Sequence, residues 1–375
     1  MKTGARLNNI QVLRAFAAIV VAVFHTGFVV PSWHAVGSFG VDVFFVISGY
    51  IMARILDPAD GASGGDHFFR HRLLRIVPPY WFFTLILFFI ALRAPQLLGA
   101  TRASAGDLIQ SLLFIPFTKE SGIIQPLLFV GWSLNYEMFF YVALAIGLLV
   151  DRRKAVFIGA AAVLAAILIA MTAKATFAPD NVFATFYSRA ISIEFLLGIL
   201  SYYLCRAIPP ETARNVRRPA LFVCIACALL LIVYQGLAPR HDSPFDIERV
   251  LYIGSLSFFL ITSASLLSQG GWDIKVAWLV LIGDASYILY LVHTYCEYFL
   301  DRIVAPHQHW LATPLGVLVG VSFSILVAIA IHLYAERPTL RYLTRKFGGK
   351  RKPTGAPNDL RADEFPAKPK DAATA

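Results

Sequence analysis

The 375-residue chain is 58% hydrophobic and 15% charged, and its formal net charge is +10. Soluble domains contain about 25% charged residues, whereas this sequence repeats apolar runs of about 20 residues, the length that crosses a bilayer as a helix. This composition excludes a soluble globular domain and predicts an all-α, polytopic membrane protein. Because the basic residues follow the loops of one side, we expect no nucleic-acid partner.

Hydropathy predicts about ten transmembrane helices, which leave no room for a second folded domain. The positive-inside rule places both termini in the cytoplasm. Residues 1–340 are expected to form the transmembrane domain, and 341–375 a basic, disordered cytoplasmic tail whose first charges lie on anionic lipid. The expected spans are 8–30, 38–56, 76–93, 130–150, 155–173, 184–204, 219–237, 250–269, 277–300 and 314–335.

The first predicted span carries Arg14 and His25 within an apolar sequence. Eleven residues make about three helical turns and rise about 16 Å, so both side chains share a face at different depths. A charged group in hydrocarbon costs from about 3 to more than 10 kcal/mol. We therefore expect this face to point into the bundle as a polar stripe. A signal peptide or a simple anchor would account for the apolar run but not for the stripe.

Three further ionisable residues, Asp42, Glu137 and His293, are predicted in the same outer layer as His25. Histidines beside carboxylates suit general acid–base catalysis, and we expect Asp42 to orient the His25 ring. The alternative is a set of independent polar pairs that hold helices together. We predict no metal site, because these residues come from distant segments without ligand spacing. Arg189 and Glu194 are expected to form a structural pair.

Residues 66–80 lead into the third span and predict a short interfacial helix. Arg72 and Arg75 are three residues apart and share a helix face. Arginine binds phosphate through two hydrogen bonds, and Arg14 is expected in the same inner layer. The three residues predict a site for a phosphate-bearing cytoplasmic ligand. Ordinary positive-inside charge is the alternative.

The chain resembles the acyltransferase-3 family of bacterial integral-membrane O-acyltransferases, especially its exopolysaccharide-modifying members. The resemblance rests on six motifs in sequence order: Leu13-Arg14-Ala with His25 following, Gly40-Val-Asp-Val-Phe-Phe-Val-Ile-Ser-Gly49, Arg72-Leu-Leu-Arg75-Ile-Val-Pro-Pro-Tyr80, Trp132-Ser-Leu-Asn-Tyr-Glu137, Ser286-Tyr-Ile-Leu-Tyr-Leu-Val-His293 and Glu336-Arg-Pro338.

This resemblance implies a cytoplasmic acyl-CoA donor, usually acetyl-CoA. It also implies an acceptor hydroxyl on an exopolysaccharide or another cell-surface glycan, at the outer face of the bacterial inner membrane. Arg14 and His25 match the family's essential pair, and Arg72 and Arg75 match the basic pair implicated with the donor. Polysaccharide-synthesis proteins are a further partner that it suggests, whereas the basic tail predicts contact with membrane lipids.

Three questions stay open at the level of sequence. His25 could act as the base for the acceptor hydroxyl or carry the acyl group transiently. Intramembrane ionisable residues also mark transporters, so a flippase for a glycan or lipid-linked precursor is the alternative function, although the repeated halves common in transporters are not visible. A scaffold in a polysaccharide export complex is the third reading.

Overall fold

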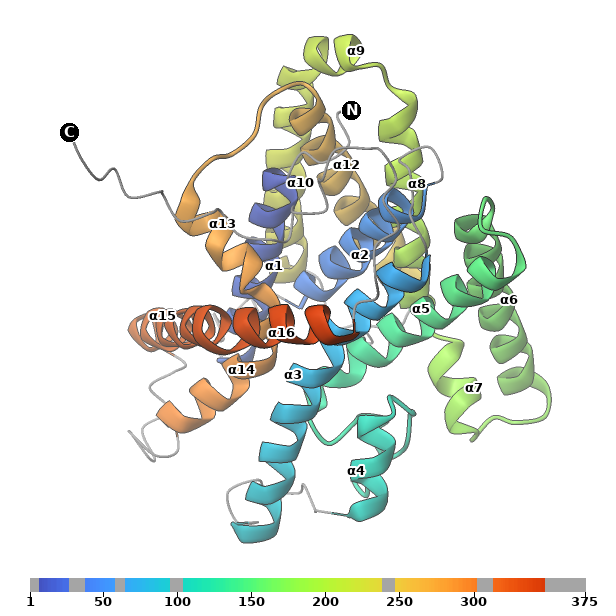
Figure 1. Ribbon diagram of the computed structural model, residues 1–375, viewed down its shortest axis with the longest axis vertical. Coiled ribbons are helices and arrows are strands. Elements are labelled where there is room, and N and C mark those ends of the chain that lie inside the picture. Colours follow the sequence, from blue (N-terminus) through green and yellow to red (C-terminus); the bar gives the residue numbers. More distant parts are fainter. Residues whose placement is uncertain are drawn as a thin grey trace.

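The computed structural model describes residues 7–26, 38–57, 65–94, 104–237, 247–301 and 313–347. In these segments the chain is mostly helical, without a named strand, as expected for an all-α protein (Figure 1). The helices are α1 (Asn8–His25), α2 (Gly40–Leu56), α3 (Gly65–Arg93), α4 (Ala105–Leu112), η3 (Phe129–Gly131), α5 (Trp132–Val150), α6 (Ala155–Thr176), α7 (Val182–Tyr187), η4 (Ala190–Ser192), α8 (Ile193–Ala207), α9 (Pro210–Asn215), α10 (Arg217–Leu237), α11 (Ile247–Arg249), η5 (Val250–Gly254), α12 (Ser255–Gln269), α13 (Ala277–Asp284), α14 (Ser286–Phe299), α15 (Pro314–Ile331), η8 (His332–Glu336) and α16 (Arg337–Phe347).

Eight helical segments of the described chain are long and apolar enough to cross a membrane. A ninth is added if α13 and α14, which meet at a bend of 74°, are one span. The short helix α2, with 17 residues, is not among them. The protein is therefore a polytopic membrane protein, and the total of about ten spans stays a prediction.

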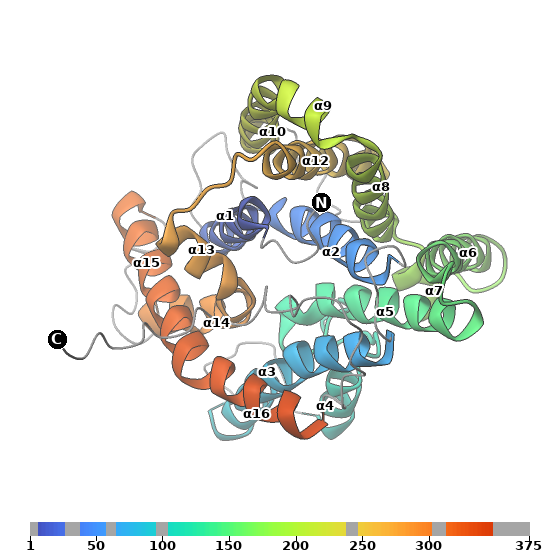
Figure 2. The same ribbon diagram turned by 45° about the horizontal axis from the view of Figure 1, so that its top comes forward.

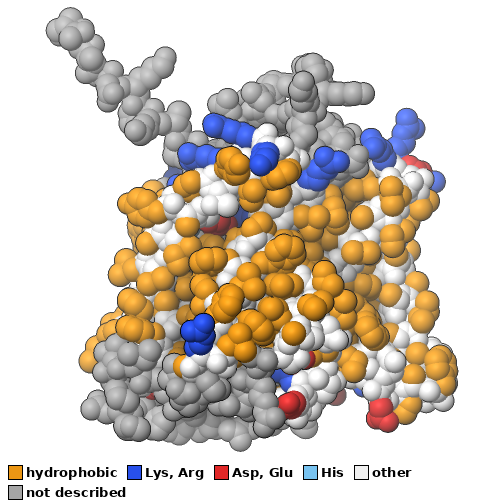
Figure 3. All heavy atoms as spheres, turned by 60° about the horizontal axis from the view of Figure 1, so that its bottom comes forward, with side chains coloured by type: hydrophobic (Ala, Val, Ile, Leu, Met, Phe, Trp, Pro, Cys, Tyr) orange, Lys and Arg blue, Asp and Glu red, His pale blue; other side chains and the backbone are white. Residues whose placement is uncertain are grey.

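The molecular surface has a broad hydrophobic region, and Lys and Arg side chains gather at one end of the molecule (Figure 3). We call this the basic end. Exposed basic residues lie in the connection between α5 and α6 and in the segment from α9 to α10: Arg152, Arg153, Lys154, Arg214 and Arg218. This is the one-sided charge distribution expected of a membrane protein whose basic loops stay in the cytoplasm.

Helices α1 and α2 lie inside the bundle, where α8, α12, α13 and α14 pack around them (Figure 2). Most residues of α2 are buried. It crosses α8 very closely, because a Cβ added at Gly49 would lie 2.0 Å from the carbonyl oxygen of Phe195, and one at Gly198 would lie 2.1 Å from that of Val46. The two glycines thus bring the backbones into contact and fix the position of α2.

Two expectations about helix boundaries need correction. Residues 66–80 are not a separate interfacial helix, because α3 is continuous from Gly65 to Arg93 with Pro78 and Pro79 inside it. Prolines are tolerated within membrane helices, where other groups satisfy the freed backbone carbonyls. At the other end of the chain, α16 reaches Phe347. The first residues of the predicted tail, 341–347, are therefore helical, and the disorder predicted from 348 onward lies outside the described residues.

Candidate active site

His25 and His293 are in direct contact. Nδ1 of His25 lies 3.1 Å from Nε2 of His293, and the ring centroids are 4.9 Å apart. His25 is the last residue of α1 and is partly exposed, whereas His293 on α14 is completely buried. The structure thus brings together two of the four residues that were predicted to carry acid–base chemistry.

Backbone carbonyls determine the tautomers of this pair. Nδ1 of His25 lies 2.9 Å from the carbonyl oxygen of Val21, and Nδ1 of His293 lies 3.0 Å from that of Leu289. A carbonyl can only accept, so each Nδ1 carries the proton and each Nε2 of a neutral ring carries a lone pair. His293 Nε2 then accepts from His25 Nδ1–H. This arrangement leaves Nε2 of His25 as the basic nitrogen of the pair.

Asp42 does not orient His25, and that prediction is wrong. Its two carboxylate oxygens accept hydrogen bonds from Nε and Nη2 of Arg249, at 3.0 and 2.6 Å. Asp42 is fully buried, and a buried carboxylate is strongly destabilising without an opposite charge. Glu194 lies against the same pair rather than forming the expected pair with Arg189. The second histidine therefore takes the place that the sequence suggested for a carboxylate.

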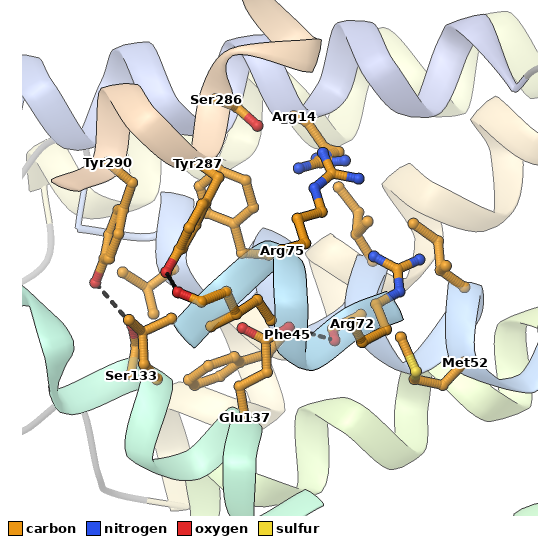
Figure 4. A pocket seen from close by; sticks show the side chains of 17 residues that line it. Arg14, Phe45, Met52, Arg72, Arg75, Ser133, Glu137, Ser286, Tyr287 and Tyr290 are labelled. Atoms are coloured by element: carbon orange, nitrogen blue, oxygen red, sulfur yellow. Dashed lines mark hydrogen bonds between the residues drawn. The ribbon is translucent and has the colours of Figure 1, made fainter. Parts of the chain in front are cut away.

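A cavity of about 90 Å³ opens between α1, α2, α3, α5 and α14. Arg14, Arg72 and Arg75 all line it, so the three guanidinium groups that were expected in one inner layer do converge on one space. Figure 4 shows them at one side, with Ser133 and Tyr290 at the other. The remaining lining residues are Val41, Phe44, Phe45, Ile47, Ser48, Ile51, Met52, Ile76, Leu134, Glu137, Ser286 and Tyr287.

Glu137 lies in this cavity rather than beside the histidines. Its Oε1 accepts hydrogen bonds from Ser48 Oγ at 3.1 Å and from the Tyr141 hydroxyl at 2.6 Å. A carboxylate in a cavity lined by three arginines offsets part of their charge, and its two hydroxyl donors hold it in one orientation. The four residues predicted to share one layer thus occupy three places: the histidine pair, the Asp42–Arg249 ion pair and the cavity.

Tyr290 contacts both the cavity and the histidine pair. It lines the cavity, and its ring centroid is 6.1 Å from that of His293. Its hydroxyl donates to the carbonyl oxygen of Val130 at 2.7 Å and lies 2.8 Å from Ser133 Oγ. The neighbouring Phe129 contacts the His25 ring, with centroids 5.3 Å apart. A chain of contacts thus runs from the cavity wall through Tyr290 to His293 and His25.

Sequence reasoning missed several of these residues. Ser48, Ser133 and Tyr290 are neutral and lie inside motifs that had been noted, so only their surroundings distinguish them from packing residues. Arg249 gave no signal, because one arginine near a predicted span resembles any loop charge. Glu297 is a further case: it follows His293 by one helical turn, is 5% exposed, and its Oε1 has no hydrogen-bond partner among the residues that the structure describes. Within the described segments no cluster of His, Cys, Asp and Glu could hold a metal ion.

Comparisons with known proteins identify the family of this chain. Residues 7–333 match the family model described as an acyltransferase domain. The chain is 32% identical to the exopolysaccharide production protein ExoZ of Rhizobium meliloti (strain 1021), over 85% of this chain and 94% of that protein. It is 25% identical to the acyltransferase MdmB of Streptomyces mycarofaciens, over 96% and 97% of the two chains.

A third relative is the putative peptidoglycan O-acetyltransferase YrhL of Bacillus subtilis (strain 168), which is 28% identical over 75% of this chain and 47% of its own length. No solved structure matches the chain. The family model covers the whole region that holds the cavity and the histidine pair, 7–333. The protein therefore belongs to the acyltransferase-3 family of membrane acyltransferases.

Proposed function

We propose that the protein is an O-acyltransferase of the bacterial inner membrane. It moves an acyl group, acetyl in the first place, from cytoplasmic acyl-CoA to a sugar hydroxyl of an exopolysaccharide or another cell-surface glycan at the outer face. The observation that carries the proposal is the order of groups along one path: three arginines, then the cavity, then Tyr290, then the histidine pair.

The arginine end suits the donor. Coenzyme A carries a pyrophosphate and a 3′-phosphate, and guanidinium groups bind phosphates through paired hydrogen bonds. Arg14 and His25 lie about 16 Å apart along α1, so the long pantetheine arm is needed to bring a thioester from the arginines to His25. The exposed basic residues favour the cytoplasm for the basic end of the molecule.

The histidine pair suits the transfer step. Nε2 of His25 takes the proton of the acceptor hydroxyl while the hydroxyl oxygen bonds to the thioester carbonyl carbon. The carbon–sulfur bond then breaks, and the proton passes from His25 to the departing thiolate. As His25 becomes positively charged, His293 Nε2 and the Val21 carbonyl both accept from its Nδ1–H and stabilise the charge. A transient acyl group on His25 Nε2 uses the same geometry.

The direct test uses detergent-purified protein with acetyl-CoA and a glycan acceptor. We expect acceptor-dependent release of coenzyme A thiol and an acceptor heavier by one acetyl group, both lost in His25→Ala. A transporter would bind or move the glycan without releasing thiol, and that result would reject the proposal. If the protein were only a scaffold, His25→Ala and the wild type would give the same thiol release and the same acceptor mass.

A further inference from the structure

The wall between the cavity and the histidine pair contains two hydroxyl groups that share one acceptor. The Tyr290 hydroxyl lies 2.7 Å from the carbonyl oxygen of Val130, and Ser133 Oγ lies 3.3 Å from the same oxygen. The two hydroxyl oxygens are 2.8 Å apart. All three groups are buried. One carbonyl is thus within hydrogen-bond distance of two donors.

Because the Val130 carbonyl has two possible donors, one of them can bind another group at a small cost in free energy. Leaving a buried carbonyl without a hydrogen bond destabilises by about 1–3 kcal/mol. If the Tyr290 hydroxyl turns toward a ligand in the cavity, Ser133 Oγ–H can still donate to Val130. The backbone therefore keeps a partner, and the change requires only rotation of two hydroxyl hydrogens.

The position of Tyr290 determines which part of a donor it would meet. In Figure 4, Tyr290 and Ser133 lie at the side of the cavity away from Arg14 and Arg72. A donor whose phosphates contact the arginines extends its acyl end toward this wall. The ring centroid of Tyr290 is 6.1 Å from that of His293, which in turn is 4.9 Å from that of His25. The thioester carbonyl and the catalytic histidine would therefore approach each other across Tyr290.

We propose that the Tyr290 hydroxyl donates a hydrogen bond to the thioester carbonyl oxygen and stabilises the negative charge that develops on it, while Ser133 takes over the Val130 carbonyl. This inference rests on the proposed acyl transfer. When the acceptor oxygen bonds to the carbonyl carbon, an electron pair moves onto the carbonyl oxygen, where Tyr290 donates. When the carbon–sulfur bond breaks, that pair re-forms the carbonyl. The same oxygen carries the charge whether the attacking atom is the acceptor oxygen or His25 Nε2.

The experiment measures kcat and KM for acetyl-CoA in Tyr290→Phe, which removes only the hydroxyl. Because the hydrogen bond strengthens as charge develops, we expect kcat to fall about 100-fold and KM to change less than about threefold. Ser133→Ala should lower kcat by a smaller factor, about tenfold, because Tyr290 must then leave Val130 without a donor when it turns.

Tyr295→Phe is the matched control. It lies on the same helix, α14, and its hydroxyl also donates to a backbone carbonyl, that of Phe83, at 2.6 Å. It does not line the cavity, so its kcat should stay within about twofold of the wild type. All variants are compared by size-exclusion profile and thermal midpoint in detergent, and Ser133→Ala provides a second reading if Tyr290→Phe does not fold.

Wild-type kcat in folded Tyr290→Phe would overturn this inference, and so would a rise in KM with unchanged kcat, which would mean that the hydroxyl binds donor and transition state equally. If Tyr290→Phe does not fold, wild-type kcat in Ser133→Ala would overturn it. A wild-type protein that transfers no acyl group would instead reject the proposed function itself.

Discussion

Nε2 of His293 lies 3.1 Å from Nδ1 of His25, on the nitrogen opposite the one that is left basic. His293 is therefore placed to hold the ring of His25 and to stabilise its positive charge, without touching the reacting atoms. Among histidine-based catalysts this is the role usually given to a carboxylate. Here a buried imidazole occupies that place.

The first prediction concerns this pair. His25→Ala should lower the transfer rate by about 10² to 10⁴, the usual contribution of a general base. His293→Ala should cause a smaller loss. His293→Gln should recover part of it, because the glutamine oxygen can accept from His25 Nδ1–H as the imidazole nitrogen does. Rates of acceptor acylation with membranes of matched protein content measure all three. Equal activity in His293→Gln and His293→Ala would exclude the positioning role.

The second prediction concerns the cavity arginines. Arg72→Ala combined with Arg75→Ala should weaken coenzyme A binding, because two of the guanidinium groups that could donate hydrogen bonds to its phosphates are removed from the cavity. Lysine at both positions should restore only part of the affinity, since it binds phosphate as a point charge. Isothermal titration of the purified protein measures the effect. Arg70→Ala is the control, because Arg70 lies on the same helix and is exposed. Unchanged affinity in the double variant would contradict the donor assignment.

The third prediction concerns Asp42 and Arg249. Arg249→Met should lower the free energy of unfolding by about 3–5 kcal/mol, because it leaves a buried carboxylate without its counter-charge. Combining it with Asp42→Asn should recover part of the loss, since the charge that needed compensation is gone. Thermal midpoints in detergent measure this cycle. If the two substitutions destabilise independently, the ion pair does not contribute as described.

The fourth prediction concerns the crossing of α2 and α8. Gly198→Ala should destabilise the protein by about 1–3 kcal/mol or more, because the added methyl group meets the Val46 carbonyl oxygen at 2.1 Å and the backbone has to move. Gly106→Ala is the matched control, since it also lies in a helix but the atom nearest to its added methyl group, Ser104 Oγ, is 3.4 Å away. If Gly198→Ala had the same thermal midpoint as the control, α2 and α8 could move apart without a loss of stability.

The fifth prediction concerns orientation. A reporter fused after residue 352 should be found in the cytoplasm, and one inserted near residue 307 outside it, because the exposed basic residues gather at one end of the molecule (Figure 3). Activity of a reporter enzyme that works on one side only distinguishes the two. The reverse pattern would place the arginine cavity on the outer side and remove access to cytoplasmic acyl-CoA.

The membrane class could be predicted because repeated apolar runs about as long as the bilayer is thick are typical of transmembrane helices and rare in soluble domains. Helical geometry also sufficed for Arg72 and Arg75, whose three-residue spacing places both on one face. The partner of Asp42 could not be predicted. Which carboxylate meets which cation depends on how distant helices rotate against one another, and depth along a helix does not specify rotation. The same limit hid Tyr290, whose proposed role depends on its contacts with both the cavity and His293.

The bend between α13 and α14 has one more consequence. Because the chain turns by 74° there, α14 starts inside the protein, and its first residues, Ser286 and Tyr287, line the cavity with the arginines. The start of a helix carries roughly half a positive charge from its aligned peptide dipoles. An anion bound in the cavity would also meet this backbone charge, which side-chain substitution cannot remove. A variant without cavity arginines should therefore keep a residual affinity for anionic ligands, set by the helix alone.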